Sequence, residues 1–389
     1  MTFHSGRHFL QTPGPTNVPD RVLRAMAAPA IDHRGPEFED LVRQVVAGVK
    51  RLCRATGPLV MFPSSGTGAW EAALVNTLSP GDKVLAFDIG QFSALWAKMA
   101  ANFGLDVDLV DGDWRRGVQP EQVYEKLAAD SGHEIKAVTI VHNETSTGAA
   151  SPVPLIREAI DRAGHPALLL VDTISSLAAM DYRHDEWGVD VTIVGSQKGL
   201  MLPPGLSMNA ISFKALDASK SARLPRGYWD WQPVLGIGDT GWFPYTPPIS
   251  LLIGLREVLG IFDEEGLPAV LQRHARYAEA TRRAVRGWGL DIVCQNPDDY
   301  SSALTAVMVP DGHDANQVRK VILERYNMSL GGGLGRLAGK VFRIGHLGDL
   351  SELTLAGTLC GVEMGLAQAG VPIARDGVRA ALDYLSAAA

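Results

Sequence analysis

Short apolar runs recur along the chain, and each is followed by polar residues and then by a segment with helical spacing. Apolar runs without polar alternation are typical of strands buried on both faces of a parallel sheet. Their alternation with helical segments over residues 58–213 predicts a mostly parallel sheet flanked by helices. The expected strands are 59–62, 83–87, 107–110, 137–141, 167–171 and 189–194.

The pattern changes beyond residue 213. Residues 226–231 and 241–248 gather aromatic residues and prolines in an irregular region, which suggests a buried interface. A long helical pattern follows from Ile249 to Val285, with a break expected at 266–268. From about residue 290 we expect a smaller α/β unit, with strands at 304–309 and 340–344 and a helix at 315–326.

A glycine-rich segment at 331–335 lies before the second strand of this smaller unit. A dinucleotide-binding loop would open a helix, whereas these glycines precede the strand-like Val341–Ile344. We therefore predict a flexible loop between strands and no dinucleotide site.

The length of the chain predicts more than one domain, because 389 residues are more than one ordinary hydrophobic core accommodates. We expect an extended arm at 1–20, a large domain at 21–265 and a small C-terminal domain at 266–389. Prolines between Thr12 and Pro19 exclude a helix in the arm. The arm is either a loose terminus or a segment laid across an active site.

Composition narrows the class of protein. Apolar residues make up 46% and charged residues 20%, and the net charge is −7 with no basic run, which argues against nucleic acid and anionic membranes as partners. The chain shows no signal peptide or targeting tail, so we expect a cytoplasmic protein. The apolar segment 353–371 carries Glu363 and predicts a packed helix, not a membrane span.

The cysteines and histidines predict no metal site. Cys53, Cys294 and Cys360 are scattered without metal-ligand spacing, as expected in a reducing compartment, and we interpret them as core or incidental residues. His142 has no second ligand at helical or hairpin spacing.

Two charged residues end neighbouring apolar runs, Asp172 after the run 167–171 and Lys198 soon after 189–194. Ligands of open α/β sheets bind beyond the carboxyl ends of the strands, so the two side chains are expected to meet there. Lys198 is either a surface lysine or, with its pKa lowered by apolar surroundings, a Schiff-base nucleophile. An aspartate beside it is the group that pyridoxal phosphate needs opposite its ring nitrogen.

Three other features each allow two interpretations. Residues 63–68 form either a phosphate-binding helix start or an ordinary Ser/Thr cap. Phe92, at a strand end, is either a core aromatic or a residue that stacks on a flat ring. Arg343, in an apolar strand, needs an anionic partner, which is either a structural carboxylate or a substrate carboxylate.

Taken together, the chain resembles the class V, fold-type I pyridoxal-phosphate aminotransferases over nearly its whole length, close to the glyoxylate-using members. The resemblance implies a large domain with a mostly parallel seven-stranded sheet and a smaller C-terminal α/β domain. It rests on Pro13-Gly14-Pro15-Thr16-Asn17-Val18-Pro19, Ser65-Gly66-Thr67-Gly68-Ala69-Trp70-Glu71, Gly90-Gln91-Phe92-Ser93, His142-Asn143-Glu144-Thr145, Asp185-Glu186-Trp187-Gly188-Val189-Asp190, Gly195-Ser196-Gln197-Lys198-Gly199, Pro244-Tyr245-Thr246-Pro247 and Phe342-Arg343-Ile344-Gly345-His346-Leu347-Gly348.

Carried onto these positions, the resemblance implies that Lys198 forms a Schiff base with pyridoxal 5'-phosphate and that Asp172 pairs with its ring nitrogen. Arg343 would bind the substrate carboxylate. Arg34 is a candidate reader of a second anion, although a surface or structural arginine fits as well. The other implied cofactor contacts are Ser65, Gly66, Thr67 and Gln197 at the phosphate, Phe92 and Ile174 on the ring, Thr145 beside it, and Tyr245 and Thr246 across a subunit interface.

The implied activity is a ping-pong transamination between a small amino acid and a 2-oxo acid, in a homodimer or a tetramer of dimers. L-Serine and glyoxylate would give hydroxypyruvate and glycine. Aspartate–glyoxylate, alanine–glyoxylate and pyridoxamine–pyruvate transamination are the alternatives. A desulfurase or other lyase of this fold would need a cysteine on a mobile loop, whereas Cys360 lies in a helical pattern. A pyridoxal-binding regulator would need a DNA-binding domain, and the sequence has neither a spare segment for one nor a basic run.

Overall fold

The alternating segments fold into one large sheet in the computed structural model, which describes residues 6–387. The strand order is β2-β10-β9-β8-β5-β3-β4. β10 runs antiparallel to both of its neighbours, and the other neighbouring strands are parallel, so the predicted mostly parallel seven-stranded sheet is confirmed. The strands are β2 (Leu59–Phe62), β3 (Lys83–Asp88), β4 (Asp106–Asp111), β5 (Ile135–Val141), β8 (Leu168–Asp172), β9 (Val191–Gly195) and β10 (Ser207–Ile211).

Helices cover this sheet and bury apolar side chains in the core. In α2, for example, Phe38, Leu41, Val42 and Val45 are all buried, while acidic residues occupy the first turn and basic residues the last, as the helix dipole favours. A two-stranded hairpin of β6 (Asn143–Glu144) and β7 (Ala149–Ala150) follows β5. The helices are α1 (Asp20–Met26), α2 (Pro36–Cys53), α3 (Gly66–Thr77), α4 (Gln91–Asn102), α5 (Pro120–Ala129), α6 (Val153–Arg162), α7 (Phe213–Ala218), α8 (Ile237–Thr240) and α9 (Ile249–Glu265), with a 3-10 turn at Gln232–Val234.

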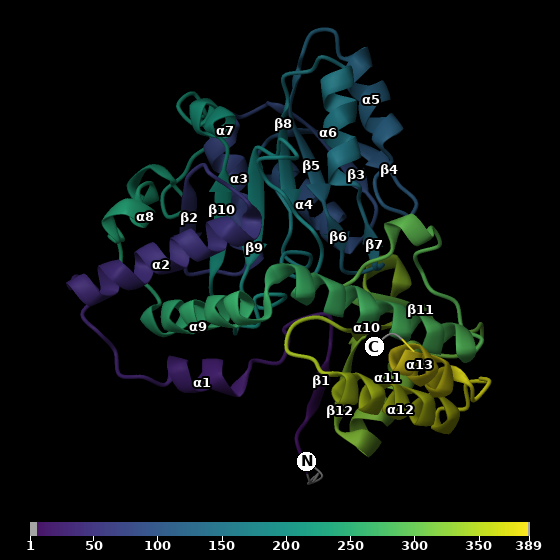
Figure 1. Cartoon of the computed structure of the whole chain (residues 1–389). Helices are drawn as coiled ribbons and strands as arrows, with labels where there is room; N and C mark the ends of the chain where they lie inside the picture. Colours follow the sequence, from purple (N-terminus) through teal and green to yellow (C-terminus); the bar gives the residue numbers. More distant parts are fainter. Residues whose placement is uncertain (1–5, 388–389) are drawn as a thin grey trace.

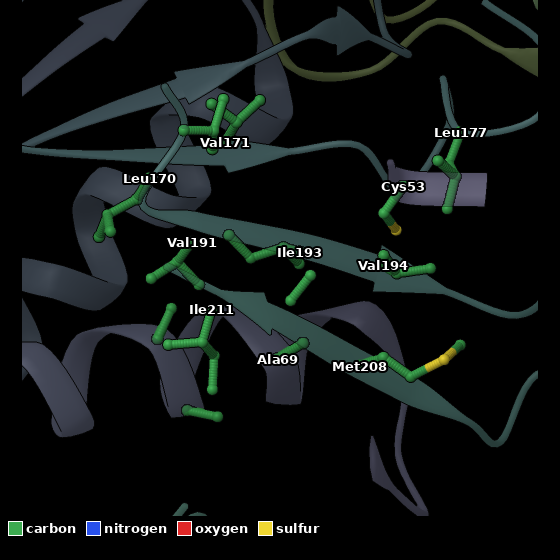
Figure 2. Close-up of a cluster of buried hydrophobic side chains, with 14 of the residues drawn as sticks. Cys53, Ala69, Leu170, Val171, Leu177, Val191, Ile193, Val194, Met208 and Ile211 are labelled. Atoms are coloured by element: carbon green, nitrogen blue, oxygen red, sulfur yellow. The ribbon is translucent and has the colours of Figure 1, made fainter. Parts of the chain in front are cut away.

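The central strands are buried along their whole length, which explains their continuous apolar sequence. Figure 2 shows Val191 and Ile193 of β9 and Ile211 of β10, with Ala69 of α3 beside them. The small Ala69 side chain lets α3 approach the sheet closely. Cys53 is fully buried in the same cluster, as expected of a core cysteine.

A second sheet lies in the lower part of Figure 1, with the order β1-β12-β13-β11. Its strands are β1 (Phe9–Gln11), β12 (Met328–Gly332), β13 (Val341–Gly345) and β11 (Leu304–Met308). The N-terminal arm thus contributes β1, which pairs in parallel with β12.

One prediction for this sheet is wrong. Gly331 and Gly332 lie in β12, not in a flexible loop. The glycine at 331 serves close packing, since a Cβ there would lie 2.7 Å from Cδ of Pro13 and 3.1 Å from Cβ of Arg343. Missing side chains look like flexibility in sequence, but here they allow the arm and β13 to approach the strand.

The predicted helix break is confirmed at Gly266, whose φ of +80° ends α9 and starts α10. In Figure 1, α10 extends from the end of α9 toward the small sheet. One core cluster runs from Val22 to Val270 and a second from Tyr277 to Leu385, while a third, smaller cluster joins Ala179 to residues between 293 and 347. The domain boundaries near 266 stay a prediction. The remaining helices are α10 (Leu267–Gly287), α11 (Ala315–Tyr326), α12 (Glu352–Gln368) and α13 (Gly377–Ala387), with 3-10 turns at Pro297–Asp299 and Gly335–Leu337.

Two kinds of feature are absent from residues 6–387. No helix in this range is long and apolar enough to cross a membrane. The same residues contain no group of three His, Cys, Asp or Glu side chains arranged to hold a metal ion. The first residues of the predicted arm and the end of the C-terminal tail, 1–5 and 388–389, lie outside the described range.

Candidate active site

Asp172 and Lys198 line one cavity at the carboxyl end of the large sheet. β8 ends at Asp172, and Lys198 lies in the turn that follows the neighbouring parallel strand β9. The cavity has a volume of about 130 Å³. Other residues predicted from sequence also line it, namely Ser65, Gly66, Thr67, Phe92, Thr145, Ile174 and Gln197.

Asp172 is a buried carboxylate with one protein donor on each oxygen. Trp70 Nε1 donates to Oδ2 at 2.8 Å, and the backbone N–H of Ile174 donates to Oδ1 at 2.7 Å. Burial raises the pKa of Asp172 to about 7, although both hydrogen bonds and Lys198 act in the opposite direction. A cationic partner in the cavity would restore the ionised form of this carboxylate.

Lys198 is partly buried, and its amine has a lowered affinity for protons. Burial lowers the pKa of Lys198 to about 8, Arg343 lowers it further by charge repulsion, and Asp172 opposes the shift. The neutral amine that a nucleophile or a general base requires is therefore more abundant near physiological pH than in an ordinary lysine. The surface-lysine interpretation does not fit this environment.

The arm lies across Lys198, as one of the two sequence interpretations expected. Lys198 Nζ donates to the carbonyl of Pro13, and the Thr16 hydroxyl donates to the backbone carbonyl of Lys198 at 3.0 Å. Gly14 has a φ of +95°, and a Cβ there would lie 2.1 Å from Cδ of Lys198. Only glycine meets both requirements at this position.

The start of α3 forms one wall of the cavity. Ser65 is the N-cap residue, but its side chain makes no capping hydrogen bond, so the ordinary cap is not what the structure contains. The first N–H groups of a helix lack partners within the helix and attract anions. Ile174 packs so closely here that a Cβ on Gly66 would lie 2.2 Å from its Cδ1.

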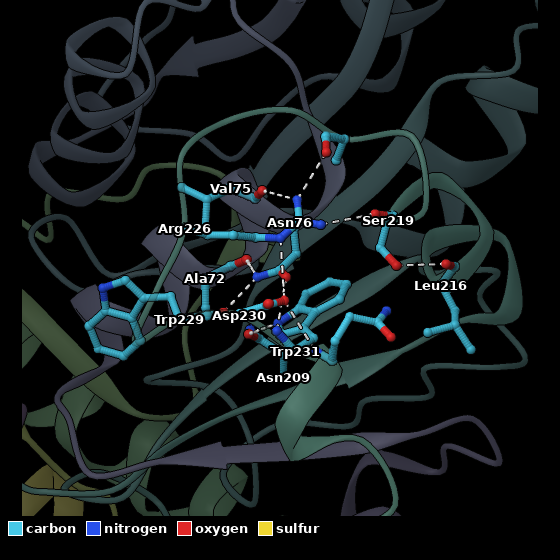
Figure 3. Close-up of polar contacts among 12 residues, drawn as sticks. Ala72, Val75, Asn76, Asn209, Leu216, Ser219, Arg226, Trp229, Asp230 and Trp231 are labelled. Atoms are coloured by element: carbon cyan, nitrogen blue, oxygen red, sulfur yellow. Dashed lines mark hydrogen bonds and ion pairs between the residues drawn. The ribbon is translucent and has the colours of Figure 1, made fainter. Parts of the chain in front are cut away.

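A buried polar network anchors the other end of α3 (Figure 3). Asn76 Nδ2 donates to the carbonyls of Ala72 and Trp229, both at 2.7 Å, and Asn76 Oδ1 accepts from the Trp231 N–H at 3.0 Å. Trp231 Nε1 in turn donates to Asn209 on β10 at 3.2 Å. These bonds tie the helix to the sheet and to the aromatic region, which fixes the position of its N-terminus.

Phe92 enters the cavity from the first turn of α4, where a buried carboxylate holds the backbone. Glu144 Oε2 accepts from the N–H groups of Phe92 and Ser93 at 3.1 and 3.0 Å. Glu144 Oε1 accepts from the N–H and hydroxyl of Ser146. Burial raises the pKa of Glu144, which these four hydrogen bonds oppose. The backbone that carries the Phe92 ring is thereby held just beyond the carboxyl end of β3.

Arg343 is 8% exposed and meets only backbone carbonyls. Its Nη1 donates to Thr145 at 2.7 Å and its Nε to Gly332 at 2.8 Å. Burial lowers the pKa of Arg343 to about 10, and no carboxylate of residues 6–387 pairs with it as a salt bridge. The structural ion pair considered from sequence is therefore not found among these residues, and the guanidinium has capacity for an anion from solution.

Four predicted site residues are not among those that line this cavity: Arg343, described above, and Tyr245, Thr246 and Arg34. The Tyr245 hydroxyl donates to the carbonyl of Met61 at 3.0 Å, and its ring stacks on Tyr228 with centroids 5.2 Å apart. Thr246 is exposed. Arg34 is also exposed, with its guanidinium 5.5 Å from the ring centre of Trp242. A contact of Tyr245 and Thr246 with a cofactor across a subunit interface stays a prediction, and so does the reading of a second anion by Arg34.

Comparison with known families decides the assignment, because the model of the family described as aminotransferase class-V matches residues 8–335. The chain belongs to the class V aminotransferase family. The protein is accordingly an aminotransferase with the fold-type I architecture, as the sequence resemblance implied. The matched range includes Asp172 and Lys198 but ends before Arg343.

Full-length relatives of this aminotransferase support the same assignment. The serine–glyoxylate aminotransferase of Methylorubrum extorquens is 50% identical, with coverage of 99% of this chain and 97% of the relative. The L-aspartate–glyoxylate aminotransferase of Paracoccus denitrificans is 47% identical, with coverage of 96% and 94%. Among solved structures, pyridoxamine–pyruvate aminotransferase from Mesorhizobium loti has a TM-score of 0.93 at 28% identity and full coverage of both chains.

Four cavity residues of the aminotransferase were not predicted as site residues: Trp70, Val141, Asn143 and Ser175. Trp70 lies one helical turn after Gly66, so helical spacing places both on one face of α3. The Ser175 hydroxyl joins Asn143 to the predicted site residue Thr145, since it accepts from Asn143 Nδ2 at 2.9 Å and from the Thr145 hydroxyl at 2.8 Å. Three of the four could have been found from the sequence because they lie close to predicted site residues: Trp70 to Gly66, Asn143 to Thr145 and Ser175 to Ile174.

The cysteines of the aminotransferase show no nucleophilic features. Burial raises the pKa of Cys53 and of Cys294 to about 12 in each case, so both thiols are protonated near neutrality. Cys360 lies within the helix α12, where burial again raises the thiol pKa. The mobile loop cysteine that a desulfurase needs is therefore not among these three.

Proposed function

We propose that the protein is a pyridoxal-phosphate-dependent aminotransferase that transfers the amino group of L-serine to glyoxylate in a ping-pong reaction. The observation that carries the proposal is the cavity in which Lys198, Asp172 and the start of α3 converge. The serine–glyoxylate aminotransferase that is 50% identical over nearly its whole length supports the choice of substrates.

The residues present fit pyridoxal 5'-phosphate. Gly66 and Gly195 let Ile174 pack against their backbone, since a Cβ would lie 2.2 and 3.1 Å from its side chain, and Ile174 in turn lines the cavity. Two buried polar atoms at the cavity, Asn143 Oδ1 and Gln197 Oε1, have no hydrogen-bond partner within the described chain. We assign the phosphate to the N–H groups and hydroxyls of Ser65–Thr67 and the ring to the space between Phe92 and Ile174.

When bound, the cofactor supplies an electron sink for the carbon that carries the amino group. Lys198 would hold it through the amine. Once substrate has released Lys198, Nζ would take the proton from the substrate Cα and deliver it to the cofactor carbon to which Lys198 had been attached, since its pKa of about 8 suits both roles near neutral pH. The Pro13 carbonyl, which accepts from Nζ, limits where this amine can swing.

Asp172 would accept a hydrogen bond from the protonated ring nitrogen. Its carboxylate is ionised more readily once a cation shares the buried site, because its raised pKa comes first from burial. The negative charge of Asp172 then keeps the nitrogen protonated.

Arg343 would bind the substrate α-carboxylate. The carbonyls of Thr145 and Gly332 hold two of its nitrogen atoms, so the guanidinium is oriented before substrate arrives. A hydrogen bond to a charged group contributes about 1.5–3 kcal/mol, which this contact would supply in fixing the Cα–H bond toward Lys198.

Aspartate is the second candidate donor, since a relative named for aspartate and glyoxylate is 47% identical. Aspartate carries a second carboxylate that would need another cation. Arg343 is assigned to the α-carboxylate, and Arg34, the candidate reader of a second anion, lies exposed with its guanidinium 5.5 Å from the ring centre of Trp242. These observations favour the uncharged side chain of serine.

We further propose a homodimer in which Tyr245 and Thr246 reach the partner's cofactor.

The test is a half-reaction followed by absorption spectroscopy of the reconstituted protein. We expect L-serine alone to remove the band of the bound cofactor aldehyde, glyoxylate to restore it, and hydroxypyruvate and glycine to form in equal amounts. L-Aspartate and L-alanine serve as parallel donors. Faster loss of the band with aspartate would replace serine as the donor, and no response to any amino acid would contradict transamination.

A further inference from the structure

Trp70 is the side chain that approaches Asp172 from the helix behind the cavity. It lies on α3, one helical turn after Gly66 of the predicted phosphate site, and is 3% exposed. Its Nε1–H points at Asp172 Oδ2 with a distance of 2.8 Å, while Oδ1 accepts from the backbone of Ile174 at 2.7 Å. Each carboxylate oxygen therefore has one donor supplied by the protein, and the cavity faces the lone pairs that remain.

We propose that Trp70 is a positioning residue that sets the orientation and charge of Asp172 toward the ring nitrogen of the bound cofactor. The inference rests on the proposed function, because it requires pyridoxal phosphate in this cavity. A rigid indole fixes the plane of the carboxylate better than water does, since its own ring is immobilised. A donor to the ionised carboxylate also stabilises the charged form.

The charges around Asp172 make this donor important. Burial is the main cause of the raised pKa of Asp172, and Glu144, in the hairpin β6–β7, adds to it by charge repulsion. Lys198 acts in the opposite direction, but during the reaction its amine is the group that changes partners. Trp70 is thus a stabilising contact that persists whatever the state of Lys198.

Trp96 supplies a matched control within the same stack. Its ring lies parallel to that of Trp70, with centroids 5.8 Å apart and an interplanar angle of 13°. It is 1% exposed, yet its Nε1 has no hydrogen-bond partner in the described part of the chain. Trp70→Phe and Trp96→Phe therefore make the same chemical change in adjacent rings, and only the first removes a donor from Asp172.

The test compares two cofactors by equilibrium dialysis with the apoprotein. One is pyridoxal 5'-phosphate, and the other is its 1-deaza analogue, in which a C–H group replaces the ring nitrogen. We expect Trp70→Phe to weaken binding of pyridoxal phosphate about tenfold and binding of the analogue less than twofold. Trp96→Phe should leave both affinities within about twofold of the unchanged protein.

A pH profile adds a readout that a packing defect would not move. Loss of the donor raises the pKa of Asp172 further, so the acid limb of kcat/KM should shift to higher pH by about one unit in Trp70→Phe and stay in place in Trp96→Phe. In an Asp172→Ala background, Trp70→Phe should have no further effect on pyridoxal phosphate affinity.

Equal weakening of both cofactors by Trp70→Phe, or unchanged affinity for both, would overturn the role of Trp70. A Trp96→Phe variant with the same selective loss would overturn it as well, because stacking would then be the cause. Failure of the unchanged protein to bind pyridoxal phosphate is a different outcome, since it would remove the proposed function itself.

Discussion

Asp172 and Lys198 reach the cavity from two adjacent parallel strands of one packed sheet, whereas the groups around Arg343 come from distant parts of the chain. Arg343 lies on β13 of the small sheet, its two acceptors are Thr145 and Gly332, and the Pro13 carbonyl above Lys198 belongs to the arm. We call the first group the cofactor side and the second the substrate side.

The two sides differ in whether a substitution should affect the chemistry alone or also the packing of the chain. The cofactor side is positioned by strands that are buried for structural reasons, so its reactive groups can change while the sheet stays intact. The substrate side depends on how the arm and the small sheet pack, as the close approach of Gly331 to Pro13 illustrates. Changes there are expected to alter both binding and stability.

The largest expected effect is on the cofactor side. Lys198→Ala removes both the cofactor attachment and the proposed base, so kcat should fall by about 10⁴-fold or more. The thermal unfolding midpoint of the apoprotein should not fall, because a buried amine is lost. The exposed Lys220, paired with Asp217, provides the control Lys220→Ala with unchanged kcat. Turnover by Lys198→Ala within tenfold of the unchanged enzyme would contradict the comparison.

On the substrate side, Arg343→Lys keeps the charge but loses the planar fork. We expect kcat/KM for the amino acid to fall about 10- to 100-fold, as the loss of a charged hydrogen bond predicts. Cofactor affinity should be little changed, which separates the two sides. Arg379→Lys on the exposed face of α13 is the control. An unchanged kcat/KM would remove Arg343 from substrate binding.

The sequence was most informative where the ends of neighbouring strands define the geometry. Asp172 and Lys198 could be predicted because apolar runs reveal strand ends, and the ends of neighbouring parallel strands meet. Trp70 was not predicted, since its hydrogen bond depends on how α3 packs against β8. The strand β12 was missed for a similar reason, because its glycines allow contacts with the arm that only the tertiary structure reveals.

Residues proposed to act between subunits mark the other limit. Tyr245 and Thr246 have recognisable sequence surroundings, yet within one chain they lie outside the cavity. The same holds for Arg34, which the sequence could not distinguish from a surface arginine. The roles proposed for Tyr245 and Thr246 would need a second copy of the chain, which no local pattern describes.

The pH dependence of cofactor uptake sharpens the account of Lys198. Only the neutral amine attacks an aldehyde, and burial lowers the pKa of Lys198 to about 8. The uptake rate measured by stopped flow should therefore rise about tenfold per pH unit below pH 8 and level off above it. A rate that keeps rising to the ordinary lysine pKa of about 10.4 would contradict this environment.

The smallest expected effect in free energy concerns the arm. Gly14→Ala forces a side chain into a positive φ and into Lys198, whereas Gly81 has a φ of +83° and a Cβ added there would meet nothing within 4 Å. Gly81→Ala should lower the free energy of unfolding by about 1–2 kcal/mol and leave kcat intact. Gly14→Ala should cost at least as much in urea unfolding and also reduce kcat. Equal kcat in both variants would show that the arm does not position Lys198.

The most direct test of the central claim locates the cofactor on the chain. The protein is reconstituted with pyridoxal 5'-phosphate, reduced with borohydride to make the attachment permanent, digested, and mapped by mass spectrometry. We predict the phosphopyridoxyl mass on the peptide that contains Lys198, in one equivalent per chain, and its loss after prior treatment with L-serine. Labelling confined to another lysine, or no stable label, would contradict the account.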